Sequence, residues 1–162
     1  MFVKHPIPPF ICPDSRVLIL GSFPSVMSRE TGFYYGHPKN RFWLLLSMLL
    51  KERMPESNAQ KHHLLAFRHI ALWDVIQSCE IKGSSDNSIR NVKINPINEL
   101  VSGTAIQTVF INGWTAGRLF LANVCPEPEK PIYILPSTSA ANASYSLNNL
   151  AEEWKAILTY LD

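Results

Sequence analysis

Hydrophobic residues occur along the chain in short uninterrupted runs, separated by longer segments that mix hydrophobic and polar positions. Four of the runs are bounded by glycine, proline or polar residues, a pattern typical of buried parallel strands. Several of the mixed segments have the spacing of amphipathic helices. We therefore predict strands at Arg16–Ser22, His69–Val75, Ile106–Gly113 and Pro131–Ser139.

The helices are predicted between and after these strands. The segment "FWLLLSMLLKER", residues 42–53, is hydrophobic on nearly every face and indicates a buried helix. The stretch "KGSSDNSIRN", residues 82–91, is expected to be irregular. Further helices are predicted at 95–103, ending at Gly103, at 114–124, and at 148–161. Strands separated by helices call for right-handed crossovers, so the predicted fold is a three-layer α/β/α sandwich around a mainly parallel sheet of about four strands.

Length and composition indicate one domain that spans residues 1–162. The chain has 162 residues, of which 46% are hydrophobic and 17% charged, as expected for a protein with a substantial core. No apolar run is long enough to cross a membrane, and prolines interrupt the N-terminal segment, so a cytoplasmic monomer without a membrane partner is expected. Cys12, Cys79 and Cys125 are far apart and are interpreted as separate buried thiols.

Charge and motif spacing exclude several classes of function. The net charge of +2 is too small to indicate a nucleic-acid-binding protein by itself, although residues 1–81 hold nine Lys/Arg against six Asp/Glu. No Walker motif, iron–sulfur pattern or metal-ligand spacing is present, so no cofactor and no metal are predicted. A serine hydrolase based on Ser22, His37 and Asp74 is a weak alternative, because "GSFPS" lacks the spacing of a nucleophile elbow.

Three strand exits carry polar or glycine-rich sequence: "GSFPS", "NGWTAG" and "LPSTSAAN". The carboxyl ends of parallel strands meet at one edge of a sheet, where ligands of such folds bind. The loop "GFYYGHPKNRFW", residues 32–43, follows the first exit and combines aromatic and cationic side chains. We therefore expect one site, built by these exits and this loop.

The ordered set "LILGSFPS", "YYGHPKNRFW" and "LPSTSAAN" resembles the uracil-DNA glycosylase superfamily. The resemblance is closest to its hypoxanthine-DNA (deoxyinosine) glycosylase branch, next to the mismatch-specific uracil/thymine glycosylases. Phe23 occupies the place of the asparagine in the first motif of the mismatch-specific relatives. Leu135, Pro136 and Ser137 stand where the uracil enzymes begin a motif with histidine. The resemblance therefore implies a functional asparagine in the H-P-x-N-R-F-W motif, Asn40.

The resemblance also implies roles for the other site residues. Asn40 would orient the attacking water through its amide oxygen, with a helix cap as the alternative role. Tyr35 would stack on a base flipped out of the duplex, or else pack on the surface. Gly21 would let the chain come close to the base, and the backbone amides of Ser22 and Phe23 would bind a base carbonyl. The alternative is that these residues form a plain strand-to-loop turn. Asn112 would read the base edge or form a turn. Contacts to the DNA backbone are expected from Ser25, Arg29, Lys39, Arg41, Ser137 and Ser139. The alternative for the three cations is ordinary surface charge.

Together these predictions indicate a monofunctional DNA glycosylase that flips a deaminated base out of DNA and hydrolyses its N-glycosidic bond. Deoxyinosine is the first choice of substrate, and uracil or thymine mismatched with guanine the second. The alternatives are a non-catalytic nucleic-acid-binding module on the same scaffold and a small-molecule hydrolase using Ser22.

Overall fold

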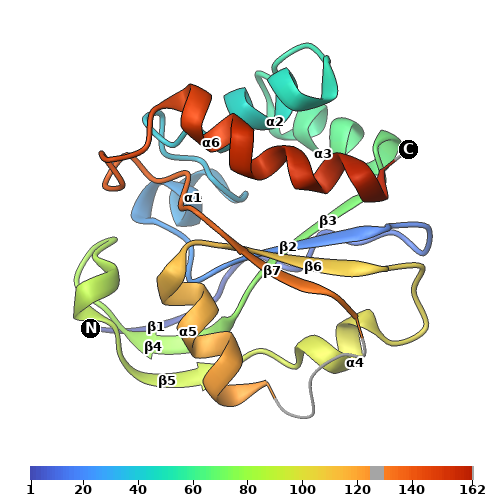
Figure 1. The fold of residues 1–162 in the computed structure, drawn as a ribbon. Coiled ribbons are helices and arrows are strands. Elements are labelled where there is room, and N and C mark those ends of the chain that lie inside the picture. Colours follow the sequence, from blue (N-terminus) through green and yellow to red (C-terminus); the bar gives the residue numbers. More distant parts are fainter. Residues whose placement is uncertain (125–129, 162) are drawn as a thin grey trace.

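The structure is a computed structural model, and it describes residues 1–124 and 130–161. A parallel sheet of four strands lies at its centre, in the order β3-β2-β6-β7 (Figure 1). Every strand of this sheet pairs in parallel with its neighbours, as predicted. Its strands are β2 (Val17–Gly21), β3 (Ile70–Asp74), β6 (Thr108–Asn112) and β7 (Ile132–Leu135).

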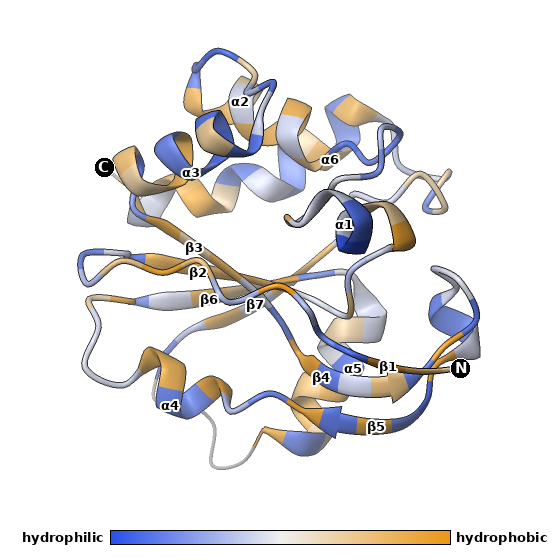
Figure 2. Ribbon diagram, turned by 180° about the vertical axis from the view of Figure 1, so that it is seen from behind, coloured by the Kyte–Doolittle hydropathy of each residue, from blue (hydrophilic) through white to orange (hydrophobic). Residues whose placement is uncertain are grey.

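Helices cover both faces of this sheet, which confirms the predicted three-layer α/β/α arrangement. One face carries α2, α3 and α6, and the other carries α4 and α5 (Figure 1). Residues 17–20 of β2 are fully buried, and hydrophobic residues follow the central strands (Figure 2). The helices are α1 (Val26–Thr31), α2 (Phe42–Leu50), α3 (Asn58–Phe67), α4 (Ile97–Val101), α5 (Trp114–Asn123) and α6 (Leu147–Trp154), which continues into the 3-10 helix η2 (Lys155–Tyr160).

A second sheet was not predicted from the sequence. It is antiparallel, in the order β1-β4-β5. Only Val75 separates β3 from β4, so the chain passes directly from the central sheet into the second one. The stretch 82–91 is not wholly irregular as expected, because it contains the 3-10 helix η1 and the start of β5. The elements are β1 (Phe2–Lys4), β4 (Ile76–Glu80), η1 (Asp86–Ser88) and β5 (Arg90–Ile94).

Two burial predictions were only partly correct. The α2 helix is not covered on every face, because Leu44 and Met48 are exposed. Cys79 is buried but Cys12 is partly exposed, and Cys125 lies outside the described residues. Across residues 1–124 and 130–161, none of the helices has the length and apolar character that a membrane crossing requires.

Candidate active site

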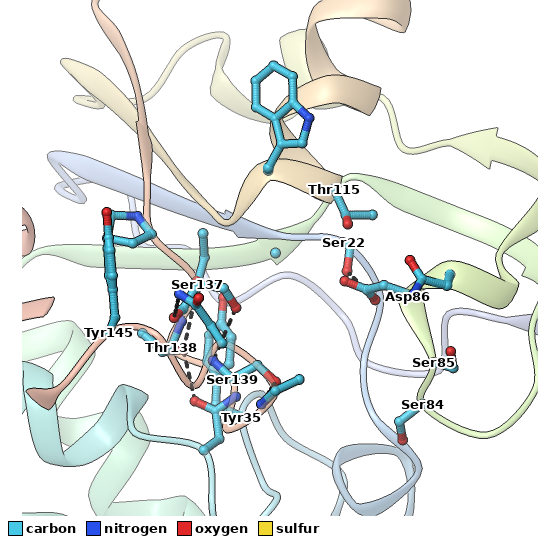
Figure 3. Close-up of a pocket in the computed structure, with 18 of the residues that line it drawn as sticks. Ser22, Tyr35, Ser84, Ser85, Asp86, Thr115, Ser137, Thr138, Ser139 and Tyr145 are labelled. Atoms are coloured by element: carbon cyan, nitrogen blue, oxygen red, sulfur yellow. Dashed lines mark hydrogen bonds between the residues drawn. The ribbon is translucent and has the colours of Figure 1, made fainter.

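A cavity of about 700 Å³ lies at the carboxyl ends of β2, β6 and β7 (Figure 3). All three polar strand exits contribute to it, together with the loop before α2, as the strand order of a parallel α/β fold predicts. We call it the strand-end cavity. Seven of the expected site residues line it: Gly21, Ser22, Tyr35, Asn40, Asn112, Ser137 and Ser139.

Tyr35 forms an aromatic wall of this cavity. Its ring stacks on Phe42, with ring centroids 4.1 Å apart and an interplanar angle of 21°. The residue has a positive φ of 55°, an uncommon conformation for a bulky side chain. Burial, together with the nearby charge of Asp74, raises the pKa of Tyr35, so the phenol stays neutral. The ring is therefore held in place from behind while it lines the cavity.

A glycine is required at position 21, where β2 ends beside Tyr35. A Cβ atom built on Gly21 would lie 2.5 Å from Asp74 Oδ1 and 3.1 Å from the Tyr35 hydroxyl. Asp74 itself is buried and pairs with His5 through Oδ2 and Nε2, 2.7 Å apart. Any larger residue at position 21 would displace this buried pair or the tyrosine.

Asn40 and Asn112 are joined through Thr138, which is fully buried. The Thr138 hydroxyl donates to Asn40 Oδ1 at 2.8 Å and accepts from Asn112 Nδ2 at 3.0 Å. Asn112 Oδ1 accepts from the Thr138 amide at 3.0 Å. The three residues therefore connect the loop before α2, the end of β6 and the loop after β7. The serines on either side of Thr138 were predicted from the sequence as site residues, but the threonine was not.

Asn40 also bonds to the start of α2, directly before the N-cap residue Arg41, and this is close to the alternative role of a helix cap. Its Oδ1 accepts from the Phe42 amide at 2.9 Å, in addition to the Thr138 hydroxyl. An amide oxygen has two lone pairs, so both are used. Two protein donors already bond to Oδ1, which opposes the expectation that this oxygen holds a water. Nδ2 is the part of the Asn40 amide that remains to act on a substrate.

Arg41 holds the loop after β7 rather than lining the cavity. Its guanidinium donates to the carbonyls of Ser139 and Asn142, at 2.9 and 3.1 Å, and to that of Tyr145. A fourth contact reaches the Thr138 carbonyl at 3.4 Å. Four of its five donors are thus used within the protein, which opposes the predicted contact with a DNA phosphate.

Four other expected residues lie outside the cavity lining. The Phe23 ring packs on the small core of the second sheet, and Phe23 is not part of the cavity lining. Ser25 caps α1 by accepting from the Ser28 amide. Arg29 donates to the Gly83 carbonyl at 2.6 Å and lies over the Phe23 ring. Lys39 is exposed and remains available for a phosphate.

Asp86 is a cavity residue that sequence analysis missed. It projects from the loop between β4 and β5, where Ser22 Oγ donates to its carboxylate at 3.2 Å (Figure 3). Although the residue is exposed overall, partial burial of its carboxyl group raises its pKa, against the opposing effect of hydrogen bonds from Ser22 and Thr115. No motif marks this aspartate, because the surrounding sequence is simply polar.

Trp114 also lines the cavity and was missed. It is the first residue of α5, and 63% of its surface is exposed. The preceding Gly113 has a φ of 97° and lies against Ser137, whose Cβ is 3.1 Å from the position of a Cβ built on that glycine. This close contact holds the start of α5 in place and therefore keeps the Trp114 indole at the rim of the cavity.

A family comparison matches almost the whole chain. Residues 8–161 fit the model described as the uracil DNA glycosylase superfamily. The chain belongs to the uracil DNA glycosylase superfamily. This confirms the family predicted from the three motifs at the strand exits.

Two relatives of this superfamily member carry the same name, hypoxanthine DNA glycosylase. The one from Methanosarcina acetivorans is 31% identical over 162 residues, covering 98% of this chain and 99% of its own. The one from Methanosarcina barkeri is 34% identical over 117 residues, covering 71% of this chain and 74% of its own. A solution NMR structure from M. acetivorans, of a protein provisionally described as a uracil DNA glycosylase, is similar with a TM-score of 0.81, 31% identity and 99% coverage of both chains.

Proposed function

We propose that this member of the uracil DNA glycosylase superfamily is a monofunctional DNA glycosylase, and that its preferred substrate is deoxyinosine. Uracil or thymine opposite guanine is the second choice. The observation that carries the proposal is the strand-end cavity, in which an aromatic ring braced by Phe42 faces amide and hydroxyl groups. The names of the two relatives support hypoxanthine as the base.

Base flipping explains why the cavity combines these groups. A base inside a duplex is unreachable, so it must leave the stack and be bound through one face and its edge. Tyr35 supplies a face, and stacking of this kind is worth about 1–3 kcal/mol per base. Asn40 supplies Nδ2 donors at the edge, because its oxygen is already bonded.

Leaving-group stabilisation requires donors aimed at the base. When the bond between C1′ of the sugar and N9 of hypoxanthine breaks, the electron pair leaves with the base, and its charge spreads onto the carbonyl oxygen. The backbone amides of Ser22 and Phe23 follow the end of β2, and their location at a strand exit suits an oxyanion-type contact. A sugar with oxocarbenium character can then be captured by water.

The absence of a lysine nucleophile supports a monofunctional enzyme. None of the described residues that line the cavity is a lysine, so no Schiff base with the sugar is expected. Water is therefore the proposed nucleophile, and the product is an abasic site in an intact strand. We further propose that the enzyme acts as a monomer in the cytoplasm.

The Ser22 hydrolase alternative is not supported by the geometry. Asp74 pairs with His5, and Ser22 Oγ donates to Asp86. His37 is exposed, and its Nδ1 accepts from the Lys39 amide. The residues named for that alternative therefore do not form a nucleophile, base and orienting acid.

End-labelled duplexes that contain inosine, uracil or thymine opposite each normal base test the proposal. We expect alkali-dependent strand scission, fastest for inosine, and no adduct after borohydride treatment. Tight binding without scission of any duplex would instead identify a nucleic-acid-binding module. Scission fastest for a base other than hypoxanthine would keep the glycosylase and change its substrate.

A further inference from the structure

The strand-end cavity needs an acceptor for the proton of the attacking water. Both lone pairs of Asn40 Oδ1 are occupied by donors of the protein, and Asn112 Oδ1 accepts from the Thr138 amide. Nδ2 groups can hold the oxygen of a water but cannot take its proton. A different group must therefore accept that proton.

Asp86 is the only carboxylate among the described residues that line the cavity. Its carboxylate accepts from Ser22 Oγ, and Ser22 directly follows β2, whose exit forms part of the cavity. Figure 3 shows Asp86, Ser22 and Thr115 together, well separated from Tyr35 and Thr138. If a flipped base lies against Tyr35, its sugar lies toward the open side of the cavity, because the sugar stays attached to the DNA backbone.

The loop that carries Asp86 is anchored on α1. Arg29 donates to the Gly83 carbonyl at 2.6 Å, and the Val26 amide donates to Ser84 Oγ at 2.9 Å. Within the loop, Ser88 Oγ donates to the Ser85 carbonyl at 2.6 Å. These bonds fix the backbone on one side of Asp86, while Ser22 fixes its carboxylate. Such support is what a catalytic group requires.

We propose that Asp86 is a catalytic residue whose carboxylate accepts a proton from the water that attacks C1′. The role rests on the proposed glycosylase function. In this step the water oxygen forms a bond to C1′, the electron pair of the C1′–N9 bond stays with hypoxanthine, and one water proton moves to the carboxylate. Asp86 then returns its proton to solvent, and the released base takes up a proton. Atoms, electrons and protons are then balanced.

The surroundings of Asp86 favour proton acceptance. Partial burial raises its pKa and the charge of Asp74 adds to this effect, whereas the hydroxyls of Ser22 and Thr115 lower it. The Arg29 guanidinium is directed to the Gly83 carbonyl of the same loop. A carboxylate with a raised pKa is a better base. The reaction should slow as the pH falls through that pKa, because a protonated Asp86 cannot accept the proton of the attacking water.

Asp86→Asn tests the role, with Asp14→Asn as the matched control. Asp14 is an exposed carboxylate that pairs with His69 away from the cavity, so both variants lose one negative charge. Single-turnover cleavage of an inosine duplex should fall roughly 10²-fold or more for Asp86→Asn, with lesion binding and melting temperature retained. Asp14→Asn should cleave within about threefold of the wild type, as expected when no catalytic group is removed.

The pH–rate profile provides a second measurement. The wild-type rate should fall at acidic pH, and the residual rate of Asp86→Asn should lack that acidic limb. A wild-type profile without the limb, an unchanged limb in the variant, or a variant rate within about threefold of the wild type would each overturn the role. A folded wild type that releases no deaminated base would overturn the proposed function itself, and the role of Asp86 with it.

Discussion

Replacing Asn40 by aspartate separates two functions that one side chain combines. The amide oxygen is structural, since it accepts from the Phe42 amide and the Thr138 hydroxyl at 2.9 and 2.8 Å. The amide nitrogen is proposed to act on the substrate. Asn40→Asp keeps the oxygen and removes the nitrogen donors, whereas Asn40→Ala removes both.

The two variants should differ in stability. Loss of the bond from the Phe42 amide costs about 1 kcal/mol, and a Thr138 hydroxyl without an acceptor costs about 1 kcal/mol more. A loss of about 2 kcal/mol lowers the melting temperature of a protein of this size by roughly 4–8 °C, which is the expectation for Asn40→Ala. Asn40→Asp should melt within about 2 °C of the wild type at neutral pH, because both bonds remain and a carboxylate at a helix start is favourable.

Both variants should lose activity. We expect the single-turnover rate on inosine duplexes to fall roughly 10²-fold or more in each, with nearly unchanged duplex binding for Asn40→Ala. Calorimetry, rapid-quench cleavage and fluorescence anisotropy measure the three quantities on the same preparations. A stable and fully active Asn40→Asp protein would refute the role of Nδ2. A destabilised Asn40→Ala protein with a normal rate per folded molecule would leave Asn40 as a cap only.

Three further predictions concern Tyr35, the two loop cations and Trp114. Tyr35→Phe keeps the aromatic face and should retain lesion binding, whereas Tyr35→Ala should weaken lesion binding and turnover together. The same loss of binding and cleavage in both variants would contradict a stacking role. Lys39→Ala should reduce the slope of log binding constant against log salt concentration by about one. Arg41→Ala should leave that slope unchanged and lower the melting temperature, because Arg41 bonds to loop carbonyls. The reverse result in salt titrations would refute the assignment of Lys39 to phosphate and of Arg41 to the loop. Of the four tryptophans, only Trp114 is exposed, so DNA should quench the intrinsic fluorescence and protect it from acrylamide; the same quenching in Trp114→Phe would show that DNA binds elsewhere.

The central sheet could be predicted because its strands are uninterrupted hydrophobic runs. Residues 17–20 and 109–111 are fully buried, and burial on both faces removes the polar positions that would obscure the pattern. The second sheet has no such signal. β1 has three residues and β5 is mostly exposed, so each becomes a strand only through pairing with β4.

Part of the site followed from the same reasoning. Strand exits in a parallel sheet share one edge, so Gly21, Ser22, Asn112 and Ser137 were expected together, and they line one cavity. Asp86 was not expected, because it reaches the cavity from the loop that joins β4 to β5. A polar loop without a motif carries no information about which of its residues faces inward.

The sequence by itself determined the class of fold, the edge of the sheet that holds the site and the family, because these depend on hydrophobic runs, chain order and local motifs. Only the tertiary structure decided which atoms remain available for chemistry. Asn40 Oδ1 is occupied by Thr138, 98 residues further along the chain, and Arg41 is occupied by carbonyls at a similar separation. Hydrogen-bond partners so distant in sequence are set by how the loops pack on the sheet, and local sequence patterns do not encode that packing.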